Sequence, residues 1–243
     1  MRTGTIFAWL AILVLAGCAQ QPVQTRASPM PPGFEAASQH ADHSWWRACF
    51  TMPFDENGAP RWSMDLLLAD RIAGPAITRH ASEIPLWRFH RRAARDGAGH
   101  RFSLLFYADP RTAAQLFAEI DSDPLVPVLV DSGYLKRLTS RCAPDTLGPG
   151  TEASSDRSWD IRLQRTWPYF IMGVSAHWLA LIGEVGAEYP QSSDAPDELL
   201  DRYGRIGDEI DEIWRKQGQH AYLHHLSALF GYQPLSVQTL MQF

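Results

Sequence analysis

Three segments in the first half of the chain alternate between large apolar and charged side chains, and no other feature constrains the fold as strongly. They are residues 44–52, 86–92 and 100–107. Because successive side chains of a β-strand point to opposite faces of its sheet, each segment predicts a strand with one apolar and one polar face. In the second strand, Trp87 and Phe89 would face one way, and Arg88 and His90 the other. The glycine-containing residues 96–99 predict the turn of a hairpin.

Helix signals stand between and after these strands. Residues 63–73 carry apolar side chains at helical spacing, and the Gly-Pro pair at residues 74–75 predicts a break or kink. Two Asp-Pro pairs, at residues 109–110 and 123–124, are typical of helix starts, since aspartate caps the helix and proline suits its first turn. Residues 134–142 then suit a fourth strand.

The order of these elements (strand, helix, strand, strand, helix, strand) predicts an α+β fold over residues 44–142. It resembles the ferredoxin-like βαββαβ sandwich, in which two helices cover one face of a four-stranded sheet. This resemblance lies in the element order alone and implies nothing about activity, because many unrelated functions share the fold. A loop over residues 143–158 and a helical C-terminal extension over residues 159–243 would follow.

The apolar segment from Trp167 to Gly183 is the main feature of that extension. Its large residues recur at helical spacing, so either a buried helix or a membrane span would account for it. We expect a buried helix, because the segment contains Ser175 and His177 and is short for a bilayer. The next helix is rich in Asp and Glu over residues 197–212.

The N-terminus has the proportions of an export signal. Residues 1–17 comprise a short basic start, an apolar run and small residues in front of Cys18. The motif Leu-Ala-Gly-Cys at residues 15–18 resembles the lipobox of bacterial lipoproteins, which implies that Cys18 becomes the lipid-modified mature N-terminus. An uncleaved signal anchor, or an ordinary signal peptide with a chance cysteine, is the alternative. Residues 18–43 lack apolar periodicity and are typical of a flexible tether.

The same resemblance implies a location. Several acyl chains on Cys18 would anchor the protein firmly to a membrane, and Ala19 after it implies the outer membrane, with the domain facing the periplasm. In that oxidising compartment, Cys49 and Cys142 are candidates for a disulfide that would stabilise the fold by roughly 4 kcal/mol. Two separate buried thiols are the alternative, because the spacing along the chain does not give the distance between the cysteines.

The polar faces of the predicted strands gather cationic residues. One face would present Arg47, Arg88, His90 and Arg92, joined by either Lys136 or Arg137. Such a face is a candidate site for a phosphate, a carboxylate or an acidic partner. Alternatively, the acidic C-terminal helix lies across it, and we favour this second layer because a half-covered sheet needs one.

Motifs that carry chemistry are missing from the sequence. It contains no HExxH, no CxxC and no glycine-rich phosphate loop. Ser175 lacks the second glycine of a serine elbow, and His220 and His224 have no carboxylate at a zinc-site spacing. We therefore expect no catalytic residue, no metal and no cofactor. The net charge of -5 and the pI of about 6.0 give no global attraction to nucleic acid.

The leading hypothesis is a non-catalytic envelope lipoprotein whose domain binds a protein partner. That partner would belong to an envelope, secretion or conjugation assembly, or would be a toxin that the protein neutralises as an immunity protein. One alternative is a binding module for a small anionic ligand or a glycan, which would use the cationic sheet face. Another is an enzyme whose catalytic residues no motif reveals.

Overall fold

The computed structural model describes residues 41–94, 99–136 and 141–235, and the side chains of residues 141–145 lie outside that description. Residues 1–40, which include the predicted export signal, Cys18 and most of the predicted tether, also lie outside it, so the lipid anchor stays a prediction.

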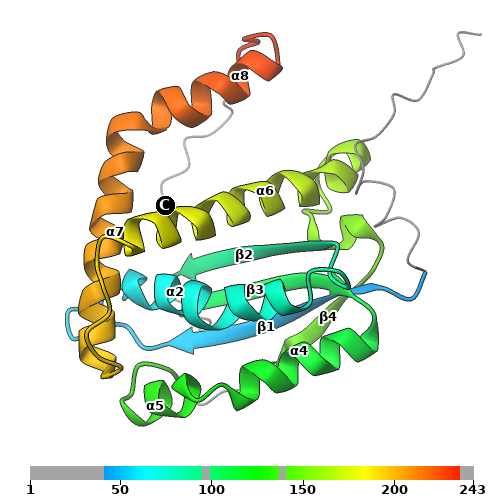
Figure 1. The fold of residues 1–243 in the computed structure, drawn as a ribbon. Coiled ribbons are helices and arrows are strands. Elements are labelled where there is room, and N and C mark those ends of the chain that lie inside the picture. Colours follow the sequence, from blue (N-terminus) through cyan, green and yellow to red (C-terminus); the bar gives the residue numbers. More distant parts are fainter. Residues whose placement is uncertain (1–40, 95–98, 137–140, 236–243) are drawn as a thin grey trace, which may run out of the picture. The chain divides into compact units, whose positions relative to one another are not determined.

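A four-stranded sheet runs through the domain (Figure 1). Its strands are β1 (Ser44–Met52), β2 (Leu86–Ala93), β3 (His100–Ala108) and β4 (Arg141–Pro149). They lie in the order β2-β3-β1-β4, and each neighbouring pair is antiparallel. The predicted α+β class and the three alternating strands are confirmed.

The fourth strand begins later in the chain than predicted. Residues 134–136 instead follow directly on helix α5 (Leu125–Asp131) and complete its C-terminal turn. Gly133 adopts a left-handed φ of 75°, and the backbone N–H groups of Tyr134 and Leu135 both donate to the carbonyl of Leu129. The predicted strand over residues 134–142 and the loop from residue 143 are therefore wrong, because the end of α5 uses these residues to satisfy a helix carbonyl.

Helices cover the apolar face of the sheet. They are α2 (Trp62–Leu68), the π-helical turn η1 (Ala69–Ala73), α3 (Gly74–Arg79) and α4 (Pro110–Ser122), together with α5. The break predicted at residues 74–75 is only a widening of the helix into η1. Glycine is needed at position 74, because a Cβ atom there would lie 2.8 Å from the carbonyl oxygen of Ala69.

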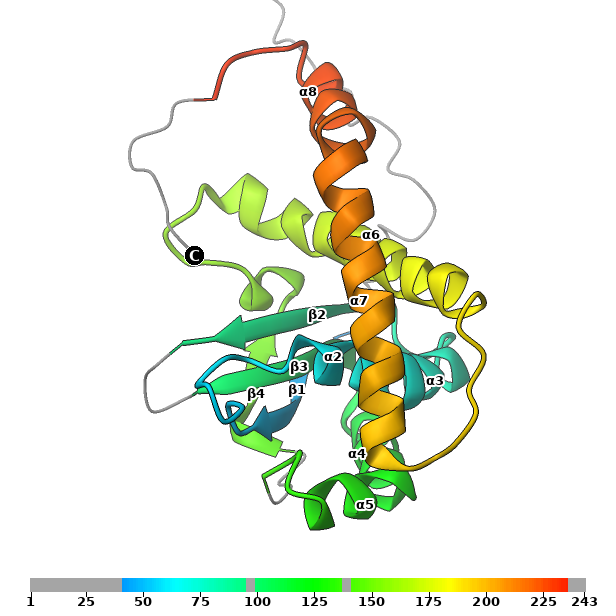
Figure 2. The same cartoon turned by 90° about the vertical axis from the view of Figure 1, so that its left-hand side faces the viewer.

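The last third of the described chain is helical, as predicted. It comprises the short 3-10 helix η2 (Thr151–Ser154), α6 (Ile161–Gly186), α7 (Pro196–Gly218), the π-helical turn η3 (Gln219–His224) and α8 (His225–Leu229). α6 lies beside the edge strand β2, and α7 packs against α2 (Figures 1 and 2).

The prediction that the long apolar helix is buried is wrong. Only 22% of the 18-residue apolar window within α6 is buried. The helix packs along the edge of the sheet and not across its face, so one side of it remains open to solvent. By length and composition alone, α6 would suffice to cross a membrane.

A buried carboxylate joins α2 to two strands. Asp65 has no exposed surface, and its oxygens lie 2.7 Å from Nε of Arg91 and 3.0 Å from Nε2 of the equally buried His100. The guanidinium of Arg91 lies between the rings of Trp62 and Trp178, 4.8 and 4.9 Å from their centroids. Because an ionised group removed from water needs partners, these contacts hold α2, the sheet and α6 together.

Replacing Asp65 by Asn tests this connection. Asp65→Asn leaves the guanidinium of Arg91 without its carboxylate, so we expect the free energy of unfolding to fall by about 3 kcal/mol. Urea unfolding followed by circular dichroism measures the change. Glu119→Gln is the control, because its carboxylate is one-third exposed where it contacts Arg79 and His80, and such surface ion pairs contribute at most about 1 kcal/mol. Equal effects of the two variants would contradict a special role for Asp65.

The Cys49–Cys142 disulfide stays a prediction, because the side chain of Cys142 lies outside the description. The backbone is compatible with it: Ala48 pairs with Arg141, so the two cysteines lie on the neighbouring strands β1 and β4. Peptide mapping without reductant should recover both in one cross-linked peptide, and reduction should lower the free energy of unfolding by up to about 4 kcal/mol. Two separate alkylated cysteine peptides from the exported, unreduced protein would refute the pairing.

Candidate functional site

Cationic side chains gather on the sheet face opposite the main core, and we call this surface the arginine face. It consists of Arg47, Arg88, His90, Arg92 and Arg101. The strand register brings them together: Arg47 and Arg88 flank Leu105 from its two sides, and Arg92 pairs directly with Arg101. The four residues predicted from the sequence therefore share one face.

Arg101 was not among the residues predicted from the sequence, although the alternation that places Phe102 in the core also places Arg101 on the arginine face. Of the two residues expected to join the face from a fourth strand, Lys136 lies outside any strand and Arg137 lies outside the described residues.

The acidic helix does not lie across the arginine face. α7 packs against α2, which covers the other side of the sheet (Figure 2). Its apolar side chains, among them Leu199, Tyr203 and Ile206, belong to the main core together with those of α2. The favoured alternative is therefore wrong. Among the described residues, a second layer covers one end of the face, where residues of η2 and α6 pack on a small cluster around Trp45, Leu105 and Tyr107.

A hollow of about 520 Å³ lies beside the arginine face, and we call it the arginine hollow. β2 contributes Arg88 and His90, the segment at the end of η2 contributes Ser154, and Trp159 and Trp167 line it from the start of the C-terminal region. The two indole rings meet edge to face, 5.3 Å apart. This volume suits a small molecule.

Two buried polar atoms at the arginine hollow have no hydrogen-bond partner among the described residues. They are the hydroxyl of Ser154, whose residue is 7% exposed, and Nε of Arg88. Another nitrogen of Arg88 donates to the Ser154 carbonyl at 3.1 Å, and its guanidinium lies 4.9 Å from the ring centroid of Trp167. Such atoms are rare in folded proteins, and one common reason is a bound group that completes their hydrogen bonds.

The electrostatics of the arginine face also favour a bound group, and one that is anionic. Burial, and then the charge of Arg47, lowers the pKa of Arg88 to about 10. Desolvation and the charges of Arg88, Arg47, Arg92 and Arg101 lower the pKa of His90. Burial is the larger cause of both shifts, and repulsion among the positive charges adds to it; an anion placed among them would relieve that repulsion.

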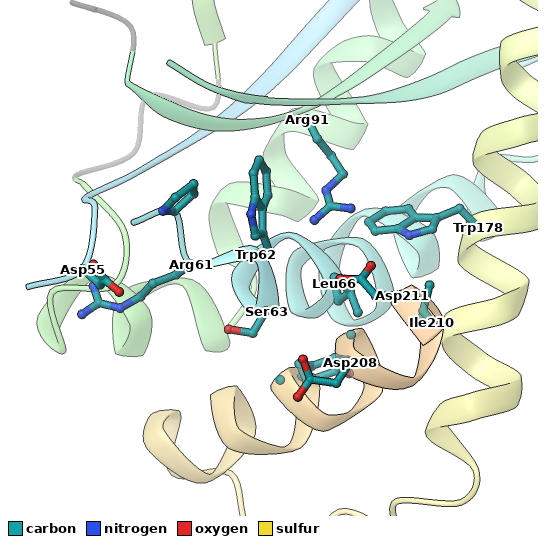
Figure 3. A pocket seen from close by; sticks show the side chains of 14 residues that line it. Asp55, Arg61, Trp62, Ser63, Leu66, Arg91, Trp178, Asp208, Ile210 and Asp211 are labelled. Atoms are coloured by element: carbon teal, nitrogen blue, oxygen red, sulfur yellow. The ribbon is translucent and has the colours of Figure 1, made fainter. Parts of the chain in front are cut away.

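A second hollow, of about 510 Å³, lies on the other side of Arg91 and Trp178 (Figure 3). Arg91 projects between Trp62 and Trp178, and Asp208 and Asp211 of α7 line the hollow as well. Asp65 already compensates the charge of Arg91, and the two aspartates would repel an anion. This hollow therefore does not extend the anion site.

The remaining candidates have structural roles or no arrangement for chemistry. Ser175 accepts a hydrogen bond from the backbone N–H of Phe89 and donates to the carbonyl of Ile171, so it joins α6 to β2. The rings of His220 and His224 stack 5.2 Å apart. Within the described part of the chain, no group of three or more His, Cys, Asp or Glu residues is arranged to hold a metal ion.

Comparisons with known proteins add no function. No family model matches the sequence, and no curated protein matches it. The crystal structure of TsrL is a distant structural match, with a TM-score of 0.37 and 13% sequence identity. The match covers 78% of this chain and 49% of TsrL, so the chain spans about half of TsrL. A likeness this weak carries no argument.

His90 gives the arginine face a measurable pH dependence. Because its pKa is lowered in the folded state, the unfolded chain binds more protons below the ordinary value of 6.5. Folding stability associated with His90 should therefore be complete at pH 8 and decrease as the pH falls below 6.5. An NMR titration should place its pKa below 6.5, and Arg101→Gln should raise it. A normal pKa that is indifferent to Arg101 would contradict the coupling.

Proposed function

We propose that the protein is an envelope lipoprotein whose domain binds a small anionic ligand in the arginine hollow. One observation carries this proposal: the buried hydroxyl of Ser154 and the buried Nε of Arg88 line the same hollow and have no partner within the described part of the chain. The lipobox resemblance at Cys18 supports the location. Binding, and not catalysis, is proposed, because the described lining of the hollow contains no nucleophile paired with a general base.

The chemistry of the hollow favours a phosphate or carboxylate group. An arginine fork donates to two oxygens of such groups, and the Ser154 hydroxyl would donate to a third atom of the ligand. One carboxylate, Asp156, also lines the hollow, and it accepts hydrogen bonds from the N–H and hydroxyl of Ser158. The rings of Trp159 and Trp167 would contact an apolar or planar part of the ligand.

We also propose that the sheet and its helices have the ferredoxin-like topology. The strand order β2-β3-β1-β4 and the antiparallel pairing of all neighbours support it. The protein partner expected from the sequence remains a hypothesis, since no contact in the arginine hollow argues for a macromolecule over a small ligand.

Calorimetric titration with inorganic phosphate and with a panel of phosphorylated and carboxylated aromatic compounds tests the anion site. The titration uses residues 19–243, which lack the predicted leader and the predicted site of lipid attachment. Arg88→Gln should weaken binding at least tenfold, because a hydrogen bond to a charged group contributes about 1.5–3 kcal/mol. Ser154→Ala should weaken it several-fold with little change in fold.

Arg162→Gln is the matched control. Its guanidinium is exposed and pairs with Asp160, outside the lining of the hollow, so affinity should be unchanged. Thermal unfolding verifies that each variant folds. If all three variants bind the ligand equally, or if no anion in the panel binds the parent chain, the proposed function is wrong.

A further inference from the structure

The outward side of α6 is apolar and lacks charge. The stretch between Arg165 and Glu184 contains no Asp, Glu, Lys or Arg, and its hydropathy averages 1.4 over 18 residues. Leu163, Phe170 and Val174 are 47%, 49% and 44% exposed. A core helix of a soluble domain would bury such residues, and single exposed side chains would not form a stripe at helical spacing.

The inward side of α6 rules out a simple membrane span. Ile182 and Val185 belong to the main core, and Ser175 is hydrogen-bonded to the edge strand β2. Inserting the helix across a bilayer would remove these contacts and leave the backbone of Phe89 without its acceptor. The helix therefore has one side in the domain and one apolar side in solvent, which is the pattern of a helix that lies in a membrane interface.

The C-terminal helices extend the apolar surface. η3 meets α6 where Nε2 of His177 lies 3.0 Å from the hydroxyl of Tyr222. Beyond this contact, Leu223, Leu229 and Phe230 are 55%, 84% and 70% exposed. α8 lies on the same side of the domain as α6 and away from α5 (Figure 1).

Charge around this surface favours an anionic partner. The described residues after Glu212 contain no Asp or Glu. Arg215 and Lys216, in the last turn of α7, both pair with Glu212, which leaves one net positive charge in this group. Arg157 and Arg165 are exposed near the N-terminal end of α6. Basic side chains next to exposed Leu and Phe are typical of helices that bind anionic lipid.

The anchored end of the chain enters the domain beside α6. β1 begins at Ser44, and the indole N–H of Trp45 donates to the carbonyl of Thr151 in η2 at 3.0 Å. Tyr169 and Met172 of α6 pack on the cluster that contains Trp45. About 20 residues separate Cys18 from the described chain, and the tether that the sequence predicts there would have a mean extension of about 25 Å. A lipid at Cys18 would thus hold α6 close to its own bilayer.

We propose that the outward side of α6, together with η3 and α8, lies on the surface of the membrane that carries the lipid anchor. The apolar side chains enter the boundary between headgroups and acyl chains, and the basic residues contact anionic headgroups. The proposal uses the expected anchor at Cys18 and is independent of the ligand in the arginine hollow.

Vesicle sedimentation tests the docking without the anchor. The mature-length chain, residues 19–243, is mixed with vesicles of phosphatidylethanolamine and phosphatidylglycerol in a three-to-one ratio. We expect it to sediment with the vesicles, and the double variant L163D/F170D to lose at least tenfold in the partition coefficient. Both side chains are half exposed, so these variants should fold like the parent chain.

Val128→Asp is the matched control, because Val128 is 40% exposed on α5, on the far side of the sheet from α6 (Figure 1). It should sediment like the parent chain. Light scattering is measured on the same samples. Failure of the parent chain to bind vesicles, binding that L163D/F170D leaves unchanged, or a dimer that this variant dissociates in place of vesicle binding each overturns the proposal. Leu163 and Phe170 do not line the arginine hollow, so phosphate binding by L163D/F170D should be unchanged, which separates the two tests.

Discussion

The pairing register of β1, β2 and β3 is the constraint on which the rest of the structure depends. It places Phe50, Phe102 and Phe89 on the side that the helices cover, and it places the five residues of the arginine face together on the other side. A shift of one residue in any strand would exchange the two sets. The burial of the aromatic core therefore brings like charges together, and the pKa values of Arg88 and His90 are lowered first by burial and then by repulsion from neighbouring arginines.

Two arginines of β2, three residues apart, show how the molecule compensates positive charge. Arg91 points to the helical side, where Asp65 and two tryptophan rings compensate it within the chain. Arg88 points to the other side, where one ring and one carbonyl meet it and its Nε stays without a partner among the described residues. The first arrangement stabilises the fold. The second leaves hydrogen-bonding capacity for a molecule from outside, and this difference is the physical basis of the proposed function.

The sequence pattern predicted correctly those features that depend on neighbouring residues, such as the face of a strand or the start of a helix. The alternation at Arg88 and His90 gave the correct face, and Asp109 before Pro110 gave the correct start of α4. The position of β4 was not predictable in this way, because Gly133 diverts the following residues into a helix end. The prediction that α6 is buried failed for another reason, because hydropathy shows which side chains avoid water but not whether protein or lipid covers them. No sequence pattern points to Ser154, since only tertiary contacts bury its hydroxyl.

X-ray diffraction from crystals grown without phosphate or sulfate and then soaked in selenate tests the central claim most directly, because the anomalous signal of selenium locates the anion itself. The account predicts a peak in the arginine hollow, with its oxygens within hydrogen-bonding distance of Nε of Arg88 and the hydroxyl of Ser154. A hollow that stays without anomalous signal, while those two atoms bond to another segment of the chain, would contradict it.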